Sequence, residues 1–455
     1  MTITQQLAEL VVGTRFEDIP QEAVEIARQV CLDGIGVMIA GAREPLGLGR
    51  IVREYTRRLG GTPEASVIAG GFRTSALNAA YANGTLCHAL DFDNTWPPLN
   101  HPTSPTLPAI LALAERNGCS GREVVAAIVL AFEVQGRMRL ASAPVAAGSG
   151  FHKPGVSGTI GAVTGAGKLL GLDVHRLCLA YGIAGSRCGS MAANTGTMTK
   201  STHSGNAARM GVEAATLADM GWTANPDIFG SGGFFGLFYG RGMYELELFV
   251  KDFGHPYRMI DPGVGFKKHP CNYFTHRPID AALELARKHD LSANEIESVE
   301  VDFPRFNYVN RPAPSTGLDG KFSVQYTTAV ALLDRRITID TFTNERRFAP
   351  DVEALLPRVR LNLRDDIPLD FTDTYAIVKA TTRDGRNLEQ RCDKPRGLWG
   401  VPLTREERLA KFRDCAEKAL PEGGVQELID LVEHLDQLQD VSRIMAIAWG
   451  ATDGR

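Results

Sequence analysis

The sequence predicts a mainly α-helical protein with an α+β part, in which a large all-helical domain carries a smaller inserted α+β lid domain. Apolar residues recur every three or four positions through the first two-thirds of the chain, which is typical of helices with one buried face. From about residue 290, apolar residues instead alternate with polar ones, as in half-buried strands. A capping pattern at Thr404 and Glu407 then marks the return of helices. We therefore expect a helical domain over 1–265, completed by 401–455, and a lid domain over 266–400.

The composition is that of a globular protein and argues against several functional classes. The 455 residues are 44% hydrophobic and 22% charged, which suits two or three packed domains. The 49 basic and 53 acidic side chains leave a net charge of −4, so we expect no nucleic-acid partner. The apolar runs are shorter than the roughly 18 residues of a membrane span, and the first residues lack the pattern of a secretion signal. The eight cysteines form no CxxC pair, which favours reduced thiols and a cytoplasmic location.

The helical part begins with a clear amphipathic pattern. Apolar side chains recur at three- or four-residue steps over 20–40, and residues 48–59 repeat that step. Ser120 and Glu123 form the capping box of a further helix that continues into an apolar stretch. Small residues let helices approach closely, and Ala and Gly are abundant in three segments: 154–171, 178–198 and 205–221. We expect these helices to form a tightly packed core.

The α+β part shows the period of strands. Apolar residues alternate with charged ones over 299–303 and over 359–363, so each stretch has one face toward a core. The stretches 375–381 and 388–391 flank Asp384-Gly385, a dipeptide typical of hairpin turns. The sequence therefore predicts two strands and a hairpin between the two helical parts.

The densest group of chemically active side chains lies in HALDFDNTWPPLNHP at 88–102. Asp91 and Thr95 are four residues apart, so one helical turn would point both in the same direction. Pro97 and Pro98 would then end the helix, leaving His101 in a loop. The alternative is a capped helix end that packs an indole in the core. So many polar groups in one loop need partners or a function, so we favour a functional site.

Two Gly- and Ser-rich segments offer cations beside helix starts. His152 and Lys153 precede a Gly-rich helix start, where backbone N–H groups could hold an anion; the alternative is close helix packing and a cap. Lys200 lies among hydroxyls, on an expected polar loop before a helix that starts near Gly205. That position suits a substrate carboxylate, although the segment could also be a solvated loop.

Two further segments lie in the α+β part. FKKHPCNYFTH at 266–276 places Lys267, Lys268 and two imidazoles at the expected domain junction, as a local positive patch. Tyr326 lies ahead of an apolar helix, where its hydroxyl could bind a substrate or anchor the helix. The chain has no dinucleotide fingerprint, Walker motif, HExxH or GxSxG. The residues together imply cations that hold carboxylates, next to an imidazole that moves a proton.

Six motifs, in order, resemble the MmgE/PrpD family over nearly the whole chain. They are the segment at 88–102 quoted above, GFHKPGVSGTIGAVTGAGKLLGLD, TMTKSTHSGNAARMG, FKKHPCNYFTH, KFSVQYTTAVALL and GVPLTREERLAKFRDCA. The resemblance implies a helical domain with an α+β lid, usually in a homodimer, and no metal or organic cofactor. The activities of the family include 2-methylcitrate dehydratase, cis-aconitate decarboxylase and iminodisuccinate epimerase.

The resemblance also implies pocket residues. The Asp-x-x-x-Thr and His-Pro motifs of the decarboxylase branch match Asp91, Thr95 and His101. The Lys of its Met-Thr-Lys motif matches Lys200, and its junction Lys and its Tyr match Lys267 and Tyr326.

Two positions differ from, or add to, this set. The decarboxylase branch has a His two residues after the junction Pro, where this chain has Asn272. The dehydratase branch resembles Asn-Asp-Thr followed later by Trp-Gly-His-Pro-Ser, which this chain also departs from. We include Asn272, together with His152, among the expected substrate-binding residues.

These residues predict a cofactor-independent lyase, a dehydratase or decarboxylase that acts on a small di- or tricarboxylate through a carbanion-like step. We expect His101 to transfer the proton, Asp91 to orient that imidazole or to favour its protonated form, and Lys200 to hold a substrate carboxylate. Lys267 would bind a substrate carboxylate. An epimerase of an amino- or imino-dicarboxylate is the alternative, since it needs the same pocket. A carboxylate-binding protein without activity is a third possibility, which the polar groups around His101 argue against.

Overall fold

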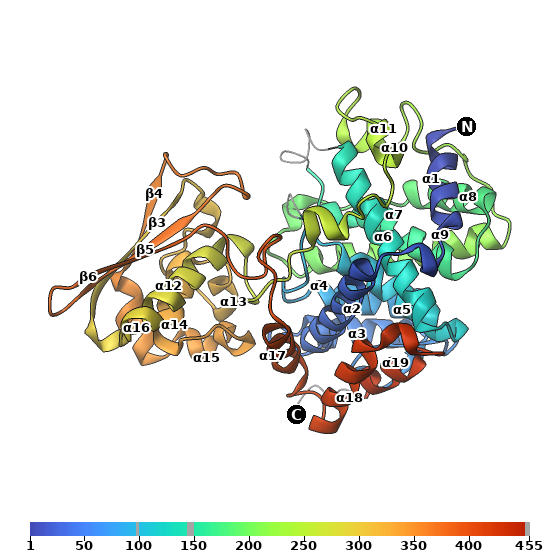
Figure 1. Ribbon diagram of the computed structural model, residues 1–455. Coiled ribbons are helices and arrows are strands. Elements are labelled where there is room, and N and C mark those ends of the chain that lie inside the picture. The colour runs from blue at the N-terminus through green and yellow to red at the C-terminus, as the bar shows by residue number, and fades with distance from the viewer. Residues whose placement is uncertain (97–99, 143–149, 451–455) are drawn as a thin grey trace. The chain divides into compact units, whose positions relative to one another are not determined.

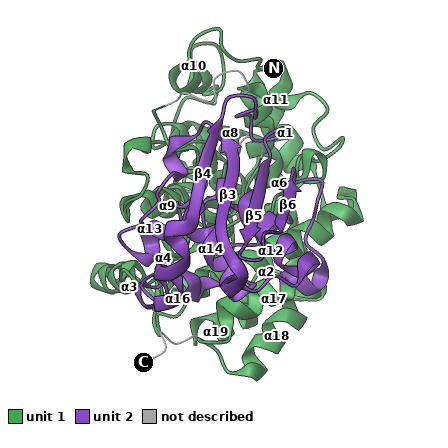
Figure 2. Ribbon diagram, turned by 90° about the vertical axis from the view of Figure 1, so that its left-hand side faces the viewer, with its two compact units in different colours: residues 1–265, 409–455 green, residues 266–408 purple. Residues whose placement is uncertain are grey.

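Two units of different architecture make up the structure, a computed structural model that describes residues 1–96, 100–142 and 150–450. One unit comprises Met1–Gly265 with Leu409–Arg455, and the other comprises Phe266–Arg408 (Figure 2). The first is helical and the second combines helices with a sheet, so the predicted mainly α fold with an α+β part is confirmed. The second unit ends at Arg408 rather than at the expected residue 400.

The first unit is a bundle of helices (Figure 1). Its described residues also include a short two-stranded antiparallel hairpin. Its helix α17 begins in the second unit and ends in the first. In chain order the elements are α1 (Ile3–Gly13), α2 (Gln21–Gly41), α3 (Leu48–Leu59), β1 (Ala65–Ser66), β2 (Arg73–Thr74), α4 (Ala76–His88), α5 (Thr103–Asn117), α6 (Gly121–Ala141), α7 (Ser157–Leu169), α8 (Val174–Gly185), α9 (Thr199–Asp219), α10 (Phe234–Tyr239), α11 (Glu247–Val250), α17 (Arg405–Ala416), α18 (Glu422–Glu433) and α19 (Ser442–Trp449).

Local signals in the sequence explain where several of these helices lie. Helices α2 and α3 coincide with the two amphipathic stretches that the periodicity predicts. The capping box of α6 is present, because Ser120 N donates to Glu123 Oε2 at 2.8 Å while Glu123 N donates to Ser120 Oγ at 3.4 Å. These predictions are confirmed.

Close packing between α4 and α9 determines where the functional side chains lie. A Cβ on Gly205 of α9 would lie 2.1 Å from Thr85 Oγ1 and 2.5 Å from the Tyr81 carbonyl oxygen, both on α4. A Cβ on Gly84 would in turn lie 3.0 Å from the Gly205 Cα. Only glycine allows this approach, so the predicted packing through small residues is confirmed. It brings the first turn of α9 next to the C-terminal end of α4.

Two helix predictions need correction. The segment 178–198 was expected to be one helix, but α8 ends at Gly185. Among the residues that follow α8, Met191 forms an isolated antiparallel β-bridge with Phe151 instead of continuing the helix. Helix α9 begins at Thr199 instead of near Gly205, and it accommodates the hydroxyl of Thr202, whose Oγ1 donates to the Thr199 carbonyl at 2.7 Å.

The second unit has a four-stranded sheet in the order β4-β3-β5-β6, with helices against one face (Figure 1). Strand β3 pairs parallel with β4 and antiparallel with β5, and β5 and β6 form the predicted hairpin. Its elements are α12 (His276–His289), β3 (Ile296–Pro304), α13 (Gly317–Gly320), α14 (Val324–Asp334), α15 (Asn344–Arg347), α16 (Pro350–Leu355), β4 (Val359–Arg364), β5 (Ala376–Thr382) and β6 (Asn387–Cys392).

The core of this unit lies between the sheet and helices α12 and α14. Val299, Val301 and Phe303 of β3 are buried there, as their alternation with polar residues predicts. Across the described residues of the chain, all eight cysteines are free thiols. Within the same residues, no helix combines the length and the apolar character that a membrane crossing requires.

Candidate active site

The loop after α4 places the first carboxylates of the candidate site. Helix α4 ends at His88, and Asp91 has a φ of 53°, in the left-handed region that Asp tolerates better than most residues. The expectation that Asp91 and Thr95 share a helical turn is therefore wrong, because α4 ends at His88, before Asp91. Pro97 and Pro98, which were expected to end it, lie outside the described residues.

Buried contacts hold this loop in place. Lys411 of α17 donates from Nζ to the Phe92 carbonyl at 2.9 Å and pairs with Asp33 of α2 at 2.6 Å. Thr95 exchanges two backbone hydrogen bonds with Gly265, at 2.8 and 2.9 Å. Contacts at Phe92 and Thr95 give the side chains of the neighbouring residues 91–95 defined positions, which a catalytic constellation requires.

Two imidazoles share one buried carboxylate. Asp93 is fully buried, and its Oδ1 lies 3.0 Å from His88 Nδ1 and 3.2 Å from His101 Nδ1. The two rings stack edge to face, with centroids 4.6 Å apart. Asp93 thereby orients His101, so that Nε2 is the ring nitrogen directed away from this buried layer.

A second, more accessible layer contains His101, Asp91 and Lys200. His101 Nε2 lies 3.5 Å from Asp91 Oδ1, and Lys200 Nζ lies 2.8 Å from the same oxygen. The three side chains keep 12%, 13% and 14% of their surface exposed, whereas those of His88 and Asp93 keep none. The structure therefore brings together the three residues that the sequence names as catalytic.

Lys200 reaches this layer from the first turn of α9. The sequence predicted a polar loop at this position, which is wrong because α9 already begins at Thr199. The helical position is the more rigid one, because Ser201 Oγ also donates to the His88 carbonyl at 3.3 Å. The sequence-based assignment of Lys200 to the site agrees with its place beside Asp91.

A second pair of imidazoles borders the first. His152 Nδ1 lies 3.1 Å from His203 Nδ1, and the His152 ring centroid is 5.4 Å from that of His88. Burial lowers the pKa of His152, and the nearby His88, Lys200 and His101 lower it further. Burial and Lys200 likewise lower the pKa of His203. This pair is therefore uncharged near neutral pH.

Burial also separates the charge states of Asp93 and His88. Burial lowers the pKa of His88 to about 4 despite the opposing effect of Asp93, so this imidazole is neutral near pH 7. Burial by itself would raise the pKa of Asp93, but His101 and His88 outweigh it and hold that pKa well below its usual range. The buried layer is thus an ionised carboxylate that is hydrogen-bonded to His88 Nδ1 and lies 3.2 Å from His101 Nδ1.

Several polar atoms around this layer have no hydrogen-bond partner among the described residues. They include both side-chain polar atoms of Asn94, Thr95 Oγ1, Asn100 Oδ1 and His88 Nε2. Buried polar groups of native proteins are nearly always paired. Their accumulation next to His101 is what a site that binds a polar ligand requires.

The same residues also offer a set of metal-ligand atoms. One atom each from His88, Asp91, Asp93 and His101 lies within 4.8 Å of all the others. Imidazole nitrogens and carboxylate oxygens suit a divalent transition metal. The contacts described above already engage each of the four, and Lys200 places a positive charge against Asp91, which a cation would have to displace.

The remaining predicted residues belong to the second unit. Lys267 is buried, with Nζ 3.3 Å from the Cys271 carbonyl and 5.8 Å from the Tyr273 ring centroid. Asn272 caps a short 3-10 helix, because its Oδ1 accepts from Phe274 N at 3.0 Å. Their substrate-binding roles stay predictions.

Tyr326 has the structural role that the sequence left open. It is fully buried in the core of the second unit, and its hydroxyl donates to the Thr341 carbonyl at 2.5 Å. The hydroxyl thus anchors α14, and the substrate-binding role of Tyr326 stays a prediction.

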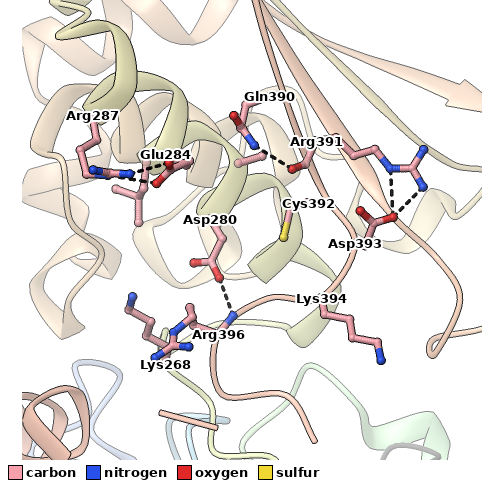
Figure 3. A pocket seen from close by; sticks show the side chains of 12 residues that line it. Lys268, Asp280, Glu284, Arg287, Gln390, Arg391, Cys392, Asp393, Lys394 and Arg396 are labelled. Carbon is pink, nitrogen blue, oxygen red and sulfur yellow. Dashed lines mark hydrogen bonds and ion pairs between the residues drawn. The ribbon is translucent and has the colours of Figure 1, made fainter. Parts of the chain in front are cut away.

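The second unit also has a surface pocket of about 550 Å³ lined mostly by charged side chains, among them the ion pairs Arg287–Glu284 and Arg391–Asp393 (Figure 3). Asp280 accepts from Arg396 N at 2.7 Å and from His269 Nε2 at 2.9 Å. Arg391 pairs with Asp393 at 2.6 Å. Because these charged side chains already have partners within the second unit, we assign no reaction to this pocket.

Three residues of the cluster are missing from the sequence-based site: His88, Asp93 and His203. His88 and Asp93 lie within the segment 88–102, but their contact across the helix end cannot be derived from helical spacing. His203 lies three residues after Lys200, on the same helical face. The three-residue spacing of Lys200 and His203 indicates a shared face only if residues 199–205 are predicted to be helical rather than a loop.

Two family models of known protein domains match this chain. The model of the MmgE/PrpD N-terminal domain matches residues 5–247, and that of the MmgE/PrpD C-terminal domain matches residues 269–437. This chain belongs to the MmgE/PrpD family. The resemblance inferred from the six motifs is thereby confirmed.

Relatives within the MmgE/PrpD family match over nearly their full length. Cis-aconitate decarboxylase of Mus musculus is 32% identical and aligns with 99% of this chain and 94% of its own. Cis-aconitate decarboxylase of Aspergillus terreus is 28% identical, over 98% of this chain and 95% of its own. 2-Methylcitrate dehydratase of Cupriavidus necator is 24% identical, over 93% and 92%.

Proposed function

We propose that this protein is a lyase that acts on a small di- or tricarboxylate, and that it releases carbon dioxide. The observation that carries the proposal is His101, which lies between two carboxylates and next to the Asp91–Lys200 pair. Decarboxylation is favoured over loss of water because the decarboxylases described above share more residues with this chain than the dehydratase does.

The reaction needs one proton and a place for one electron pair. When the bond to the leaving carboxylate breaks, its electron pair moves onto the substrate carbon and is delocalised toward a second carboxylate. Lys200 stabilises this negative charge, and His101 delivers a proton from Nε2 to the carbon. Solvent then returns a proton to the imidazole, so the net reaction consumes one proton and releases carbon dioxide.

The buried layer prepares His101 for this step. An imidazole has an unperturbed pKa of about 6.5 and can serve as acid or base near neutral pH. The Oδ1 of ionised Asp93 lies 3.2 Å from His101 Nδ1, and this contact fixes the orientation of the ring. Neutral His88 shares Asp93 without adding a second positive charge.

A panel of di- and tricarboxylates, including cis-aconitate, incubated in deuterated buffer and followed by proton NMR tests the proposal. We expect one substrate to lose a carboxylate and to gain one deuterium at the carbon that carried it, with release of carbon dioxide. Loss of water instead would make the protein a dehydratase.

Two other outcomes would contradict the proposal. Incorporation of deuterium without any loss of mass would identify the epimerase that the sequence leaves as an alternative. Tight binding by calorimetry without turnover of any member of the panel would identify a carboxylate-binding protein.

The assembly and the compartment complete the proposal. We expect a homodimer, as the family resemblance implies, which light scattering would report as twice the 49.3 kDa of one chain. We also expect the protein to act in the cytoplasm, because its free thiols suit a reducing compartment. Fractionation of the source cells would test this location, and recovery in an organelle would contradict it.

A further inference from the structure

Arg139, in the last turn of α6, is a buried cation without a described partner. The residue is 4% exposed, and its Nε and both terminal nitrogens are buried with no hydrogen bond within the described residues. A guanidinium stays protonated in proteins, so burial cannot be relieved by loss of the charge. The helix dipole favours a cation in this turn but supplies no acceptor to the three nitrogens. An anion in contact with Arg139 would supply what is missing.

Lys153 provides a second cation in the same region. Burial and, to a smaller extent, repulsion by Arg139 together lower the pKa of Lys153 to about 8, so the two charges are close enough to interact. Lys153 opens a 3-10 helix over Lys153–Gly155, which leads into α7. Two buried like charges repel each other, which is unfavourable by itself. An anion between them would replace this repulsion with attraction.

Contacts connect this pair of cations to the candidate active site. Lys153 directly follows His152, whose ring borders His88. Asn100, the neighbour of His101, donates from Nδ2 to Ser157 Oγ at 3.3 Å, and Ser157 Oγ donates to the Lys153 carbonyl at 3.1 Å.

The helix that carries Arg139 borders the catalytic loop as well. A Cβ on Gly136, one helical turn before Arg139, would lie 3.1 Å from Cη2 of Trp96, which follows Thr95 in the loop. The backbone of Lys153 and the helix that carries Arg139 thus contact Asn100 and Trp96 through packed neighbours, close in sequence to His101.

We propose that Arg139 and Lys153 form a second carboxylate subsite, which binds a substrate carboxylate remote from the one at Lys200. The guanidinium fork matches the two oxygens of a carboxylate, and an ammonium adds a point charge. This inference rests on the proposed function, because a di- or tricarboxylate has a further carboxylate to place. It assigns a specificity role to residues that take no part in the proton transfer.

Binding of unreactive acids to the full-length protein tests the subsite without turnover. Tricarballylate has three carboxylates, whereas glutarate and methylsuccinate each lack one of them. We expect Arg139→Met to weaken tricarballylate about tenfold or more in calorimetric titration, and Lys153→Met to weaken it several-fold. At least one of the two dicarboxylates should bind Arg139→Met within about twofold of wild type, because it lacks the carboxylate that Arg139 would hold.

The outcome that overturns the inference is an equal loss of affinity for all three acids, or no loss for any of them. Arg50→Met, on the exposed surface of α3, is the matched control and should change no affinity. If no substrate is turned over but Arg139→Met still weakens tricarballylate binding, the proposed lyase activity is refuted and the proposed subsite is supported.

Thermal unfolding without ligand separates this role from a structural one. If the subsite awaits a ligand, Arg139→Met removes an unpaired buried charge, so its Tm should equal or exceed that of wild type. A lower Tm, or a variant that no longer has the mass of the wild-type assembly, would show that Arg139 serves the fold or a partner chain and would contradict the inference.

Discussion

Asp93 shows how one buried residue can set the geometry of two imidazoles. It contacts His88 and His101 through Nδ1 of each ring, and neither Asp93 nor His88 has exposed side-chain surface. The sequence identified His101, Asp91 and Lys200, because their chemistry is visible in short motifs. It did not reveal the orienting role of Asp93, because the contact spans a helix end and a left-handed turn at Asp91.

We expect Asp93→Asn to lower kcat by about a hundredfold while KM changes less than about threefold. The amide keeps the shape of the carboxylate but removes the negative charge that lies 3.2 Å from His101 Nδ1 and orients that ring. Steady-state kinetics on the substrate identified by NMR measures both constants. Asp219→Asn, at an exposed ion pair, is the control; a variant that raises KM alone would assign Asp93 to substrate binding instead.

The stability of the protein should depend on His88 between pH 6.5 and 4. The pKa of His88 is about 4 in the folded protein and about 6.5 in an unfolded chain. As the pH falls through this window, the unfolded state binds a proton that the folded state excludes, so stability decreases with falling pH. Between pH 7.5 and 5, wild type should lose about 2 kcal/mol more than His88→Gln in urea unfolding. Parallel losses in the two proteins would contradict the neutral state of His88.

At the scale of secondary structure, the approach of α9 to α4 decides whether Lys200 reaches the site. The abundance of Ala and Gly predicted close helix packing, but composition does not say which helices meet. It also suggested a helix as far as residue 198, whereas α8 ends at Gly185 because the following residues form bridges and turns instead. Such tertiary pairings are not encoded in local propensity.

We expect Gly205→Ala to destabilise the protein by about 1–3 kcal/mol, because its methyl group would overlap Thr85 Oγ1. Activity should fall with it, since the start of α9 carries Lys200. Gly423→Ala is the matched control: it lies in an exposed position of α18 with no atom within 4 Å of its Cβ. The control should gain about 0.5–1 kcal/mol from helix propensity. Denaturant unfolding that shows no loss for Gly205→Ala would contradict the packing described here.

At the scale of the whole molecule, the sequence predicted the two architectures well. The change from a three-to-four-residue period to a two-residue period separates the helical unit from the unit that contains the sheet. The short hairpin β1–β2 was not predicted, because each of its strands has two residues and too little pattern to be recognised.

Removal of metal ions should leave the protein active. We expect dialysis against EDTA to change kcat by less than about twofold, since the proposed steps use only an imidazole and an ammonium. Elemental analysis of the dialysed protein serves as the control that removal is complete. A loss of activity that Zn²⁺ restores would show instead that the four ligand atoms around His101 hold a functional ion.

Replacement of His101 by Gln is the most direct test of the account. Glutamine retains a hydrogen-bonding side chain but cannot deliver a proton at neutral pH. We predict that kcat falls about a thousandfold, while calorimetry shows an affinity for tricarballylate within about threefold of wild type. Turnover within about tenfold of wild type, which corresponds to about 1.4 kcal/mol of barrier, would show that His101 is not the proton donor.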